Sequence, residues 1–398
     1  MAVGLTNSFF DKKREWSKIK DTLLGCYLKP YSAKIFSTKR DIVYIDAFSG
    51  TGKFKDGTLG SPLIAYDVFS TAKENSRFSN DVNFVCIEKN NYDELNDNVK
   101  DCSNLQVIAD DYENVIVEVL SKQYGKNVFL YIDPFGIKNI KMDYFKFANN
   151  KSFFSVELLL NFNSFGFIRE GCRLLGMDTP FDDVDDEGFL QNIKLVDEEK
   201  NDINNMNAIA GGDYWQDIIK SMKSKSLDGY EAEKKFAKMY CEMLKEYTKF
   251  KYVINLPIRV NQNNRPKYRM VFATNHLEGF LLMNDGMAKR HSELREHQEK
   301  GAMCLFEETV ENDILEDDRI EKIILSSLSV SFELDINEVI LKVIEEIGIY
   351  HTSKIRDIIS TLATDGKIKI RREPPFTSNG KPAKFLTTSR DKKVYLSL

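Results

Sequence analysis

The sequence predicts an α/β protein with a doubly wound, mostly parallel sheet, followed by a C-terminal winged helix-turn-helix domain. Three observations predict this fold class. Short apolar runs alternate with helical stretches over the first 165 residues, which is typical of a parallel sheet covered by helices on both faces. Two further apolar runs, joined by a short polar turn, follow residue 249. The chain then ends in two helical stretches and a strand–loop–strand pattern.

Five apolar runs supply the parallel part of the sheet. They are DIVYID, VNFVCIE, LQVIAD, VFLYID and SVELLLNF, and the first four end on an acidic residue. Residues 16–36 predict one or two amphipathic helices that cover the ligand or the edge of the sheet. The stretch 61–74 has the signals of a helix start, with Ser61 as N-cap and Pro62 at the first helical position.

The second half of the chain completes the sheet and adds a domain. Residues 176–206 are acidic and weakly periodic, so we expect an insertion or lid there rather than core, whereas 231–247 predict an amphipathic helix. FKYVINLPIRV and PKYRMVFATN predict an antiparallel pair around the turn NQNNR. We expect a first domain over 1–290, with a helical N-terminal segment and an insertion near 170–250. We expect a charged helical linker to follow over 291–320. The winged domain then occupies 321–398, with PAKFL and VYLSL as its wing strands.

Composition is that of a soluble globular enzyme, with 42% apolar and 29% charged residues. No apolar run approaches a membrane span and the N-terminus lacks a signal-peptide stretch, so we expect a cytoplasmic location. The 6 cysteines and 4 histidines are scattered without metal-ligand spacing, which predicts reduced thiols and no metal centre.

Charge is unevenly distributed along a chain whose net charge is −5. From His351 onward basic residues outnumber acidic ones, so the C-terminal end is a basic module on an acidic body. We expect the helix that begins near Thr352 to enter a nucleic-acid groove and the wing to contact phosphates. The predicted contacts are Lys354, Arg356, Lys367, Lys369, Arg371, Arg372 and Lys384.

The loop after the first strand, in DIVYIDAFSGTGKF, is the first candidate site. Ligands of doubly wound sheets bind at the carboxyl ends of strands, and here Asp46 ends the strand while Gly50 and Gly52 let backbone approach a ligand. The loop lacks the first glycine of a P-loop, and its glycine spacing differs from that of a nicotinamide fingerprint. ATP hydrolysis and nicotinamide binding are therefore disfavoured.

The next two strand ends add acidic groups to that edge. Glu88 can accept hydrogen bonds from both ribose hydroxyls of a nucleoside. Asp110 or Asp111 can reach an adenine amine while Tyr112 or an apolar neighbour packs on the ring. Three acidic strand ends beside a glycine loop predict a nucleoside-bearing ligand.

The fourth strand ends in DPFG, which predicts an amine site. An exocyclic base amine is a poor nucleophile because its lone pair is delocalised into the ring. The Asp133 carboxylate and the Pro134 carbonyl can accept both amine hydrogens, and Phe135 can stack on the base. A helix-capping Asp-Pro turn is the structural alternative.

DAFSGTG with DPFG resembles the class I S-adenosylmethionine-dependent methyltransferases that modify exocyclic amines of nucleic-acid bases, whose fourth motif is Asp/Asn-Pro-Pro-aromatic. Phe135 replaces the second Pro, so DPFG is closer to the tRNA guanine dimethyltransferases. The blocks YIDAFSGTGKFKDGTLGSPLIA, FVCIEKN, FLYIDPFG, ELLLNFNSFGFIR and YRMVFATNH, in that order, resemble the three-Cys-motif partner (TcmP) family over about residues 40–280. The terminal unit is similar to the winged-helix domain of that family.

This resemblance implies a Rossmann-like class I methyltransferase sheet with an antiparallel final strand and S-adenosyl-L-methionine as cofactor. It also implies a bacterial or phage protein whose partner is a radical-SAM-like protein with a three-cysteine motif. Asn161, Asn163 and Arg169 are polar where the target would enter, or else satisfy loop backbone. The implied cofactor site is Asp46, Phe48, Gly50, Gly52, Glu88 and Asp110 or Asp111, and the implied amine site is Asp133, Pro134 and Phe135.

The leading interpretation is methyl transfer from S-adenosylmethionine to a nucleobase amine in DNA or RNA. The alternative is a non-catalytic subunit that binds S-adenosylmethionine or nucleic acid within a bacterial or phage complex. A metal-dependent nuclease is a weaker alternative, because no Asp/Glu-x-Lys follows a second carboxylate at the expected spacing.

Overall fold

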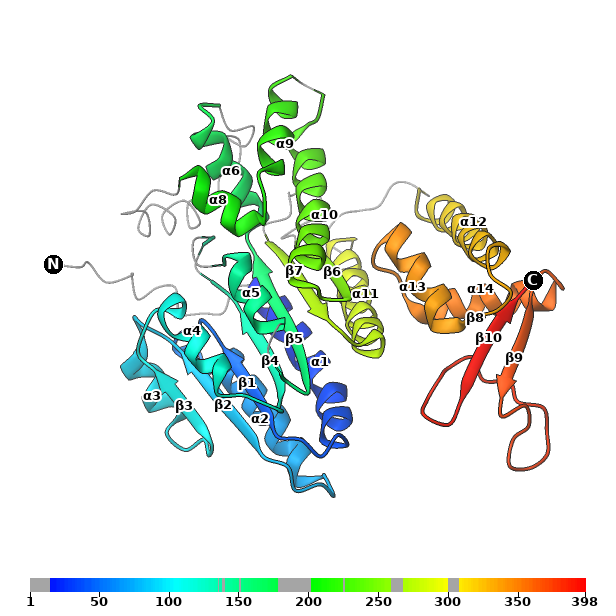
Figure 1. Cartoon of the computed structure of the whole chain (residues 1–398), viewed down its shortest axis with the longest axis horizontal. Helices are drawn as coiled ribbons and strands as arrows, with labels where there is room; N and C mark the ends of the chain where they lie inside the picture. The colour runs from blue at the N-terminus through cyan, green and yellow to red at the C-terminus, as the bar shows by residue number, and fades with distance from the viewer. Residues whose placement is uncertain are drawn as a thin grey trace. The chain divides into compact units, whose positions relative to one another are not determined.

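The computed structural model describes residues 15–134, 136–137, 140–149, 152–177, 202–224, 226–258, 268–299 and 308–398. These residues divide into two compact units, residues 1–280 and 281–398, and Figure 1 labels their elements. The boundary lies within one helix, Leu277–Glu299. Each unit is described separately.

The first unit is built on a seven-stranded sheet in the order β3-β2-β1-β4-β5-β7-β6 (Figure 1). The five strands nearest the N-terminus are parallel, β7 is antiparallel to β5, and β6 is antiparallel to β7. This is the mostly parallel, Rossmann-like sheet that the sequence predicts, and the final strand β7 alone runs against the other six. The strands are β1 Ile42–Asp46, β2 Val82–Ile87, β3 Leu105–Ile108, β4 Asn127–Ile132, β5 Ser155–Phe162, β6 Tyr252–Ile258 and β7 Tyr268–Thr274.

Helices surround this sheet. Within the described residues, no helix combines the length and apolarity needed to cross a bilayer. Residues 16–36, for which one or two helices are expected, form a single helix, α1. The helices are α1 Glu15–Phe36, α2 Ser61–Glu74, α3 Tyr92–Val99, α4 Tyr112–Ser121, α5 Met142–Asn149, α6 Ser164–Leu174, α8 Ile203–Ala210, α9 Tyr214–Lys223, α10 Gly229–Thr248 and the start of α11 Leu277–Glu299.

Alternation along the strands decides which helices cover which face of the sheet. Successive residues of a strand point to opposite faces. Phe129 on β4 packs its ring 5.4 Å from Tyr31 of α1, measured between centroids, and Tyr44 on β1 stacks on Phe129. Leu130, the next residue of β4, belongs instead to the large core cluster with residues of α4, α5 and α10. The Tyr44 face of the sheet is therefore the α1 face.

Two details differ from the sequence expectations. The N-cap of α2 is Gly60, not Ser61, because the Gly60 amide donates to the Gly52 carbonyl at 2.8 Å and the Ser61 hydroxyl hydrogen-bonds Asp46 instead. Most of the acidic segment 176–206 lies outside the described residues. Its last residue, Met206, is fully buried in the large core cluster, so this end of the segment is core rather than lid.

The second unit contains a helix–strand–helix–helix–strand–strand sequence after α11. Its three-stranded sheet has the order β8-β10-β9, and both pairings are antiparallel. The strand that pairs with the last strand is KIRRE rather than the predicted PAKFL, because Pro382 opens that stretch and only one isolated bridge forms there. The elements are α12 Glu308–Ser329, β8 Leu334–Asp335, α13 Ile336–Ile347, α14 Thr352–Thr364, β9 Lys369–Glu373 and β10 Lys393–Ser397.

A buried carboxyl under α1 makes the stability of the first unit pH-dependent. Glu157 of β5 is 4% exposed and accepts hydrogen bonds from Tyr27 at 2.6 Å and from Thr274 at 3.4 Å. Burial raises the pKa of Glu157 to about 7, which those hydrogen bonds partly oppose. Because the folded pKa lies above the unfolded value, this group stabilises the fold below pH 4.5 and loses that contribution as the pH rises toward 7.

Between pH 4 and pH 8, the free energy of unfolding is therefore expected to fall by about 3 kcal/mol more in the wild type than in Glu157→Gln. A glutamine keeps the volume and the acceptor for Tyr27 without the charge. Urea unfolding of both proteins across this range measures the difference. Glu118→Gln, at an exposed salt bridge to Lys122, is the matched control. Parallel pH profiles for wild type and Glu157→Gln would contradict the assignment.

Candidate functional site

The loop after β1 is fixed by hydrogen bonds that three of its backbone amides donate. Ala47 donates to the Tyr131 carbonyl at 2.9 Å, Ser49 to the Ile87 carbonyl at 3.1 Å, and Gly50 to Glu88 Oε2 at 2.9 Å. The loop therefore lies against the ends of β2 and β4.

Glycine is required within this loop. Gly50 and Gly52 have φ values of 57° and 71°, in the left-handed region. A Cβ on Gly52 would also lie 2.8 Å from Leu95 Cδ1. Both predicted glycines are thus needed by the backbone itself.

Asp46 lies at the end of β1 with no exposed surface. Its carboxylate accepts from the Tyr44 hydroxyl at 3.2 Å and from the Phe48 amide at 3.4 Å. Burial raises the pKa of Asp46 to about 7, opposed by hydrogen bonds from Ser61, Tyr44 and Phe48. The carboxyl therefore changes charge near neutral pH.

Glu88 holds the loop to the end of β2. Its Oε1 accepts from the Asn90 amide at 2.9 Å and from the Asn91 amide and side chain at 3.0 and 3.1 Å. Its Oε2 accepts from the Gly50 amide, and the residue is 5% exposed. A carboxylate offers about four acceptor positions. Oε2 can therefore accept a hydrogen bond from one ligand hydroxyl, whereas the sequence predicts that Glu88 accepts from both ribose hydroxyls.

The end of β3 supplies a polar and aromatic rim. Asp110 Oδ1 accepts from the Asp111 amide at 2.6 Å and from Asn114 at 2.8 Å, and Asp111 pairs with Lys89 at 2.6 Å. The Tyr112 ring is buried, and the half-buried Phe48 ring packs on it with centroids 5.4 Å apart. Phe48 rather than Tyr112 is thus the ring with exposed surface.

Asp133 follows β4, and Lys20 and Asn161 donate hydrogen bonds to its carboxylate. Its Oδ2 accepts from Lys20 Nζ of α1 at 2.6 Å, and its Oδ1 accepts from Asn161 Nδ2 of β5 at 2.6 Å. Lys20 is 7% exposed, and its ammonium lies 5.4 Å from the centre of the Tyr268 ring. Tyr131 of β4 pairs with Leu159 of β5. Asp133 and Asn161 lie two residues further along these strands, so they point to the same face of the sheet, the α1 face.

The remaining predicted residues separate into three groups. Pro134 is buried, and Phe135 lies outside the described residues. Asn163 caps α6 by accepting from the Gly166 amide at 2.7 Å, so it satisfies loop backbone rather than facing a target. Arg169 lies on α6.

Lys20 is one of two residues of this site that sequence reasoning missed. It lies 113 positions before Asp133, within a helix whose apolar spacing gave no reason to single out one lysine. Tyr131 was also missed, although its side chain is fully buried and its hydroxyl lies beside Asp133. Burial raises the pKa of Tyr131, and the charges of Asp133, Asp21 and Asp46 raise it further, as does a hydrogen bond to Asp133.

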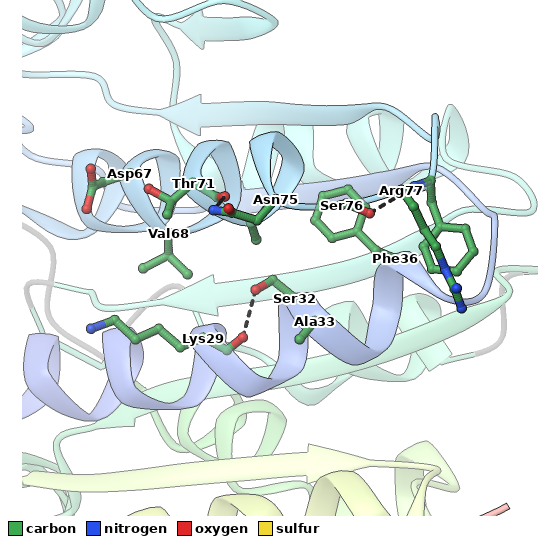
Figure 2. Close-up of a pocket in the computed structure, with 12 residues that line it drawn as sticks. Lys29, Ser32, Ala33, Phe36, Asp67, Val68, Thr71, Asn75, Ser76 and Arg77 are labelled. Carbon is green, nitrogen blue, oxygen red and sulfur yellow. Dashed lines mark hydrogen bonds between the residues drawn. The ribbon is translucent and has the colours of Figure 1, made fainter.

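A separate groove of about 700 Å³ lies between α1 and α2 (Figure 2). Phe36, at the end of α1, and Asn75 to Phe78, which precede β2, line it. These residues come before strands begin, so the groove lies toward the amino ends of β1 and β2. It is distinct from the edge that carries Asp46 and Asp133.

The predicted nucleic-acid residues of the second unit are mostly bound to neighbouring groups. Arg356 donates to the Leu386 carbonyl and Arg372 to the Phe385 carbonyl, at 3.1 and 2.8 Å, and both arginines are half-buried. Lys367 pairs with Glu321 and Arg371 with Glu333, each at 2.6 Å. Lys369 donates to Leu398, Lys354 lies over the Tyr350 ring, and Lys384 is exposed.

The N-terminus of α14 is covered by α11. Thr352 is 2% exposed, and its amide and hydroxyl donate to Asp285 at 2.9 and 2.8 Å. Asp285 therefore occupies the N-terminal end of α14, which the sequence predicts to enter a nucleic-acid groove. The exposed positions nearest this end begin at Ser353 and Lys354.

Comparison with known proteins gives structural similarity alone. No family profile and no curated protein matches the chain in sequence. Spermidine synthase from Thermotoga maritima is similar with 7% identity and a TM-score of 0.32, covering 71% of this chain and 70% of that chain. Trm1 from Pyrococcus horikoshii, solved with S-adenosyl-L-methionine, has 12% identity and a TM-score of 0.33, covering 66% and 56%. The plantazolicin methyltransferase BamL, solved with SAH, has 11% identity and a TM-score of 0.32, covering 68% and 90%. Because these identities and TM-scores are low, the fold assignment rests on the strand order of this chain.

Proposed function

We propose that this protein transfers a methyl group from S-adenosyl-L-methionine to an exocyclic amine of a nucleic-acid base. One observation carries the proposal: the glycine loop after β1 and the Asp133 carboxylate after β4 meet at the same edge of the sheet, with Ala47 bonded to Tyr131. Ligands of this sheet type bind at that edge.

The residues around the loop fit a nucleoside with a charged tail. The left-handed Gly50 and Gly52 bring backbone close to a ligand, Glu88 Oε2 retains an acceptor position, and the Phe48 ring is half-exposed. Asp110 or Asp111 lies where the third strand ends, within reach of a base amine. When bound, S-adenosyl-L-methionine supplies an electrophilic methyl group on a sulfonium, which is already a good leaving group.

Asp133 would position the acceptor amine. A carboxylate that accepts an N–H localises the nitrogen lone pair and can take the proton that the nitrogen loses. In the structure Lys20 and Asn161 hold this carboxylate, and their hydrogen bonds leave acceptor positions on it for an N–H of the substrate amine. Orientation of the amine toward the methyl group would supply most of the acceleration.

The second unit would bind the nucleic acid. Its helix–strand–helix–helix–strand–strand order is that of a winged helix, with α14 and the β9–β10 wing as the contact elements. The exposed Lys354 and Lys384 are the best placed of the predicted phosphate contacts, whereas Arg356 and Arg372 stabilise the unit itself.

Membership in the TcmP family and a radical-SAM-like partner with a three-cysteine motif belong to the same proposal, and rest on the sequence blocks. The alternative is a non-catalytic subunit that binds S-adenosylmethionine or nucleic acid within a complex. The Lys20–Asp133 ion pair favours this alternative, because the ammonium competes with a substrate amine for the carboxylate.

Isothermal calorimetry with S-adenosylmethionine, NAD and ATP tests the cofactor assignment. Wild type is expected to bind only S-adenosylmethionine, and Glu88→Gln to weaken that binding about 10–100-fold, because Glu88 Oε2 is the charged acceptor left for a ligand hydroxyl. Glutamine keeps the side-chain length and one oxygen acceptor, so the fold is expected to survive. Asp67→Asn, on the exposed side of α2, is the control. Absence of binding by wild type would favour the non-catalytic alternative.

A further inference from the structure

One buried oxygen at the amine site lacks a donor. Asn161 is 2% exposed, and its Oδ1 has no hydrogen-bond partner among the described residues. A buried acceptor left unpaired destabilises a fold, and such groups are rare in native structures. Its position next to Asp133 relates it to the proposed reaction.

The orientation of this side-chain amide is set by its neighbours. Lys20 Nζ lies 2.6 Å from Asp133 Oδ2, so Asp133 is an ionised carboxylate that only accepts. Asn161 must therefore direct its NH₂ group to Asp133 Oδ1, as the 2.6 Å distance shows. Rotating the amide to satisfy its oxygen would bring two acceptors together. The side-chain carbonyl of Asn161 therefore lies beside the Asp133 carboxylate and accepts no hydrogen bond from the described residues.

We propose that Asn161 is the second acceptor of the amine site and that Asp133 and Asn161 together take both N–H groups of a primary amine. The inference rests on the proposed function. It assigns to the side chain of Asn161, on the buried strand β5, the role that the sequence predicts for the Pro134 carbonyl. The substrate class is then an unmethylated exocyclic amine, because only that group has two hydrogens to donate.

A restriction on the product follows. After one transfer the nitrogen keeps a single N–H, so a monomethylated amine would leave one of the two acceptors unpaired. A site that hydrogen-bonds a polar group discriminates strongly against an analogue lacking it. The protein is therefore expected to stop after one methyl group.

The test compares single-stranded oligonucleotides that contain adenine, cytosine or guanine with their N-monomethylated counterparts, using labelled S-adenosylmethionine. Wild type is expected to prefer the primary amine by about 10-fold or more in kcat/KM, and Asn161→Leu to lower this ratio toward 1 while raising KM for the acceptor. Asn127→Leu is the matched control. That asparagine is buried at the amino end of β4, and its bonds to Thr38 and Ser155 are complete.

The outcomes separate the two proposals. An unchanged ratio in Asn161→Leu, with transfer intact, would overturn the role of Asn161 and leave the proposed function standing. A fall in kcat at constant ratio would mean that Asn161 only positions Asp133, which also overturns the inference. No transfer by wild type to any oligonucleotide would remove the proposed function and the inference together.

Discussion

Replacing Asp133 by Asn is expected to lower kcat for methyl transfer by about 10²–10⁴-fold, the usual contribution of a positioned general base. Asparagine cannot take the proton that the amine nitrogen loses, yet it keeps an oxygen for the Asn161 amide. The loop that would bind the cofactor contacts β4 through the backbone carbonyl of Tyr131, not through the Asp133 side chain. Affinity for S-adenosylmethionine should therefore remain within about twofold.

Single-turnover transfer from labelled S-adenosylmethionine measures the first quantity, and calorimetry the second. Asp81→Asn is the control, because this aspartate is exposed before β2 and pairs with Lys73 at 2.7 Å. Loss of cofactor binding in proportion to turnover would show that Asp133 supports the cofactor site rather than the amine.

Glu233→Ala is expected to destabilise the first unit by about 3–5 kcal/mol, because it leaves a buried guanidinium without its counter-charge. Glu233 of α10 is 2% exposed and accepts two hydrogen bonds from Arg269 of β7, both at 2.6 Å, and one from Ser164 at 2.5 Å. Arg269 also donates to Asn255 of β6 at 2.7 Å. The ion pair thus joins α10 to both antiparallel strands.

Urea unfolding followed by circular dichroism measures the change. Glu242→Ala lies on the same helix, in an exposed pair with Lys238 at 3.9 Å, and should cost no more than about 1 kcal/mol. Adding Arg269→Met to Glu233→Ala should recover part of the loss, since it removes the unpaired charge. Equal effects of Glu233→Ala and Glu242→Ala would contradict a buried role for the first pair.

Most of the sheet follows from local sequence. Strands buried on both faces are nearly continuous apolar runs, so DIVYID and VFLYID are distinctive and were predicted within a residue or two. The wing was harder, because KIRRE alternates between exposed and half-buried residues at a sheet edge and has no apolar run to identify it. The two-residue strand β8 was not predicted for the same reason.

The site was predictable only where single residues end strands. Asp46, Glu88 and Asp133 follow directly from the rule that ligands bind at the carboxyl edge. Their partners do not, because Lys20 reaches Asp133 through the packing of α1 on the sheet, which no local pattern encodes. The acidic partners of the basic module could not be predicted for a related reason. Glu321 and Glu333 precede the stretch whose charges were compared, yet the fold pairs them with Lys367 and Arg371.

The fastening of the loop from Ala47 to Gly52 also bears on affinity. Ordering the backbone of one residue costs about 1–2 kcal/mol in conformational entropy at 25 °C. A loop of this length that became ordered only on binding would subtract several such contributions from the affinity for its ligand. Here hydrogen bonds to Tyr131, Ile87 and Glu88 order the loop as the sheet forms. The entropic cost of ordering the loop is therefore met when the protein folds and not when the ligand binds. A small cofactor then binds a preorganised surface, and its affinity is not reduced by this cost.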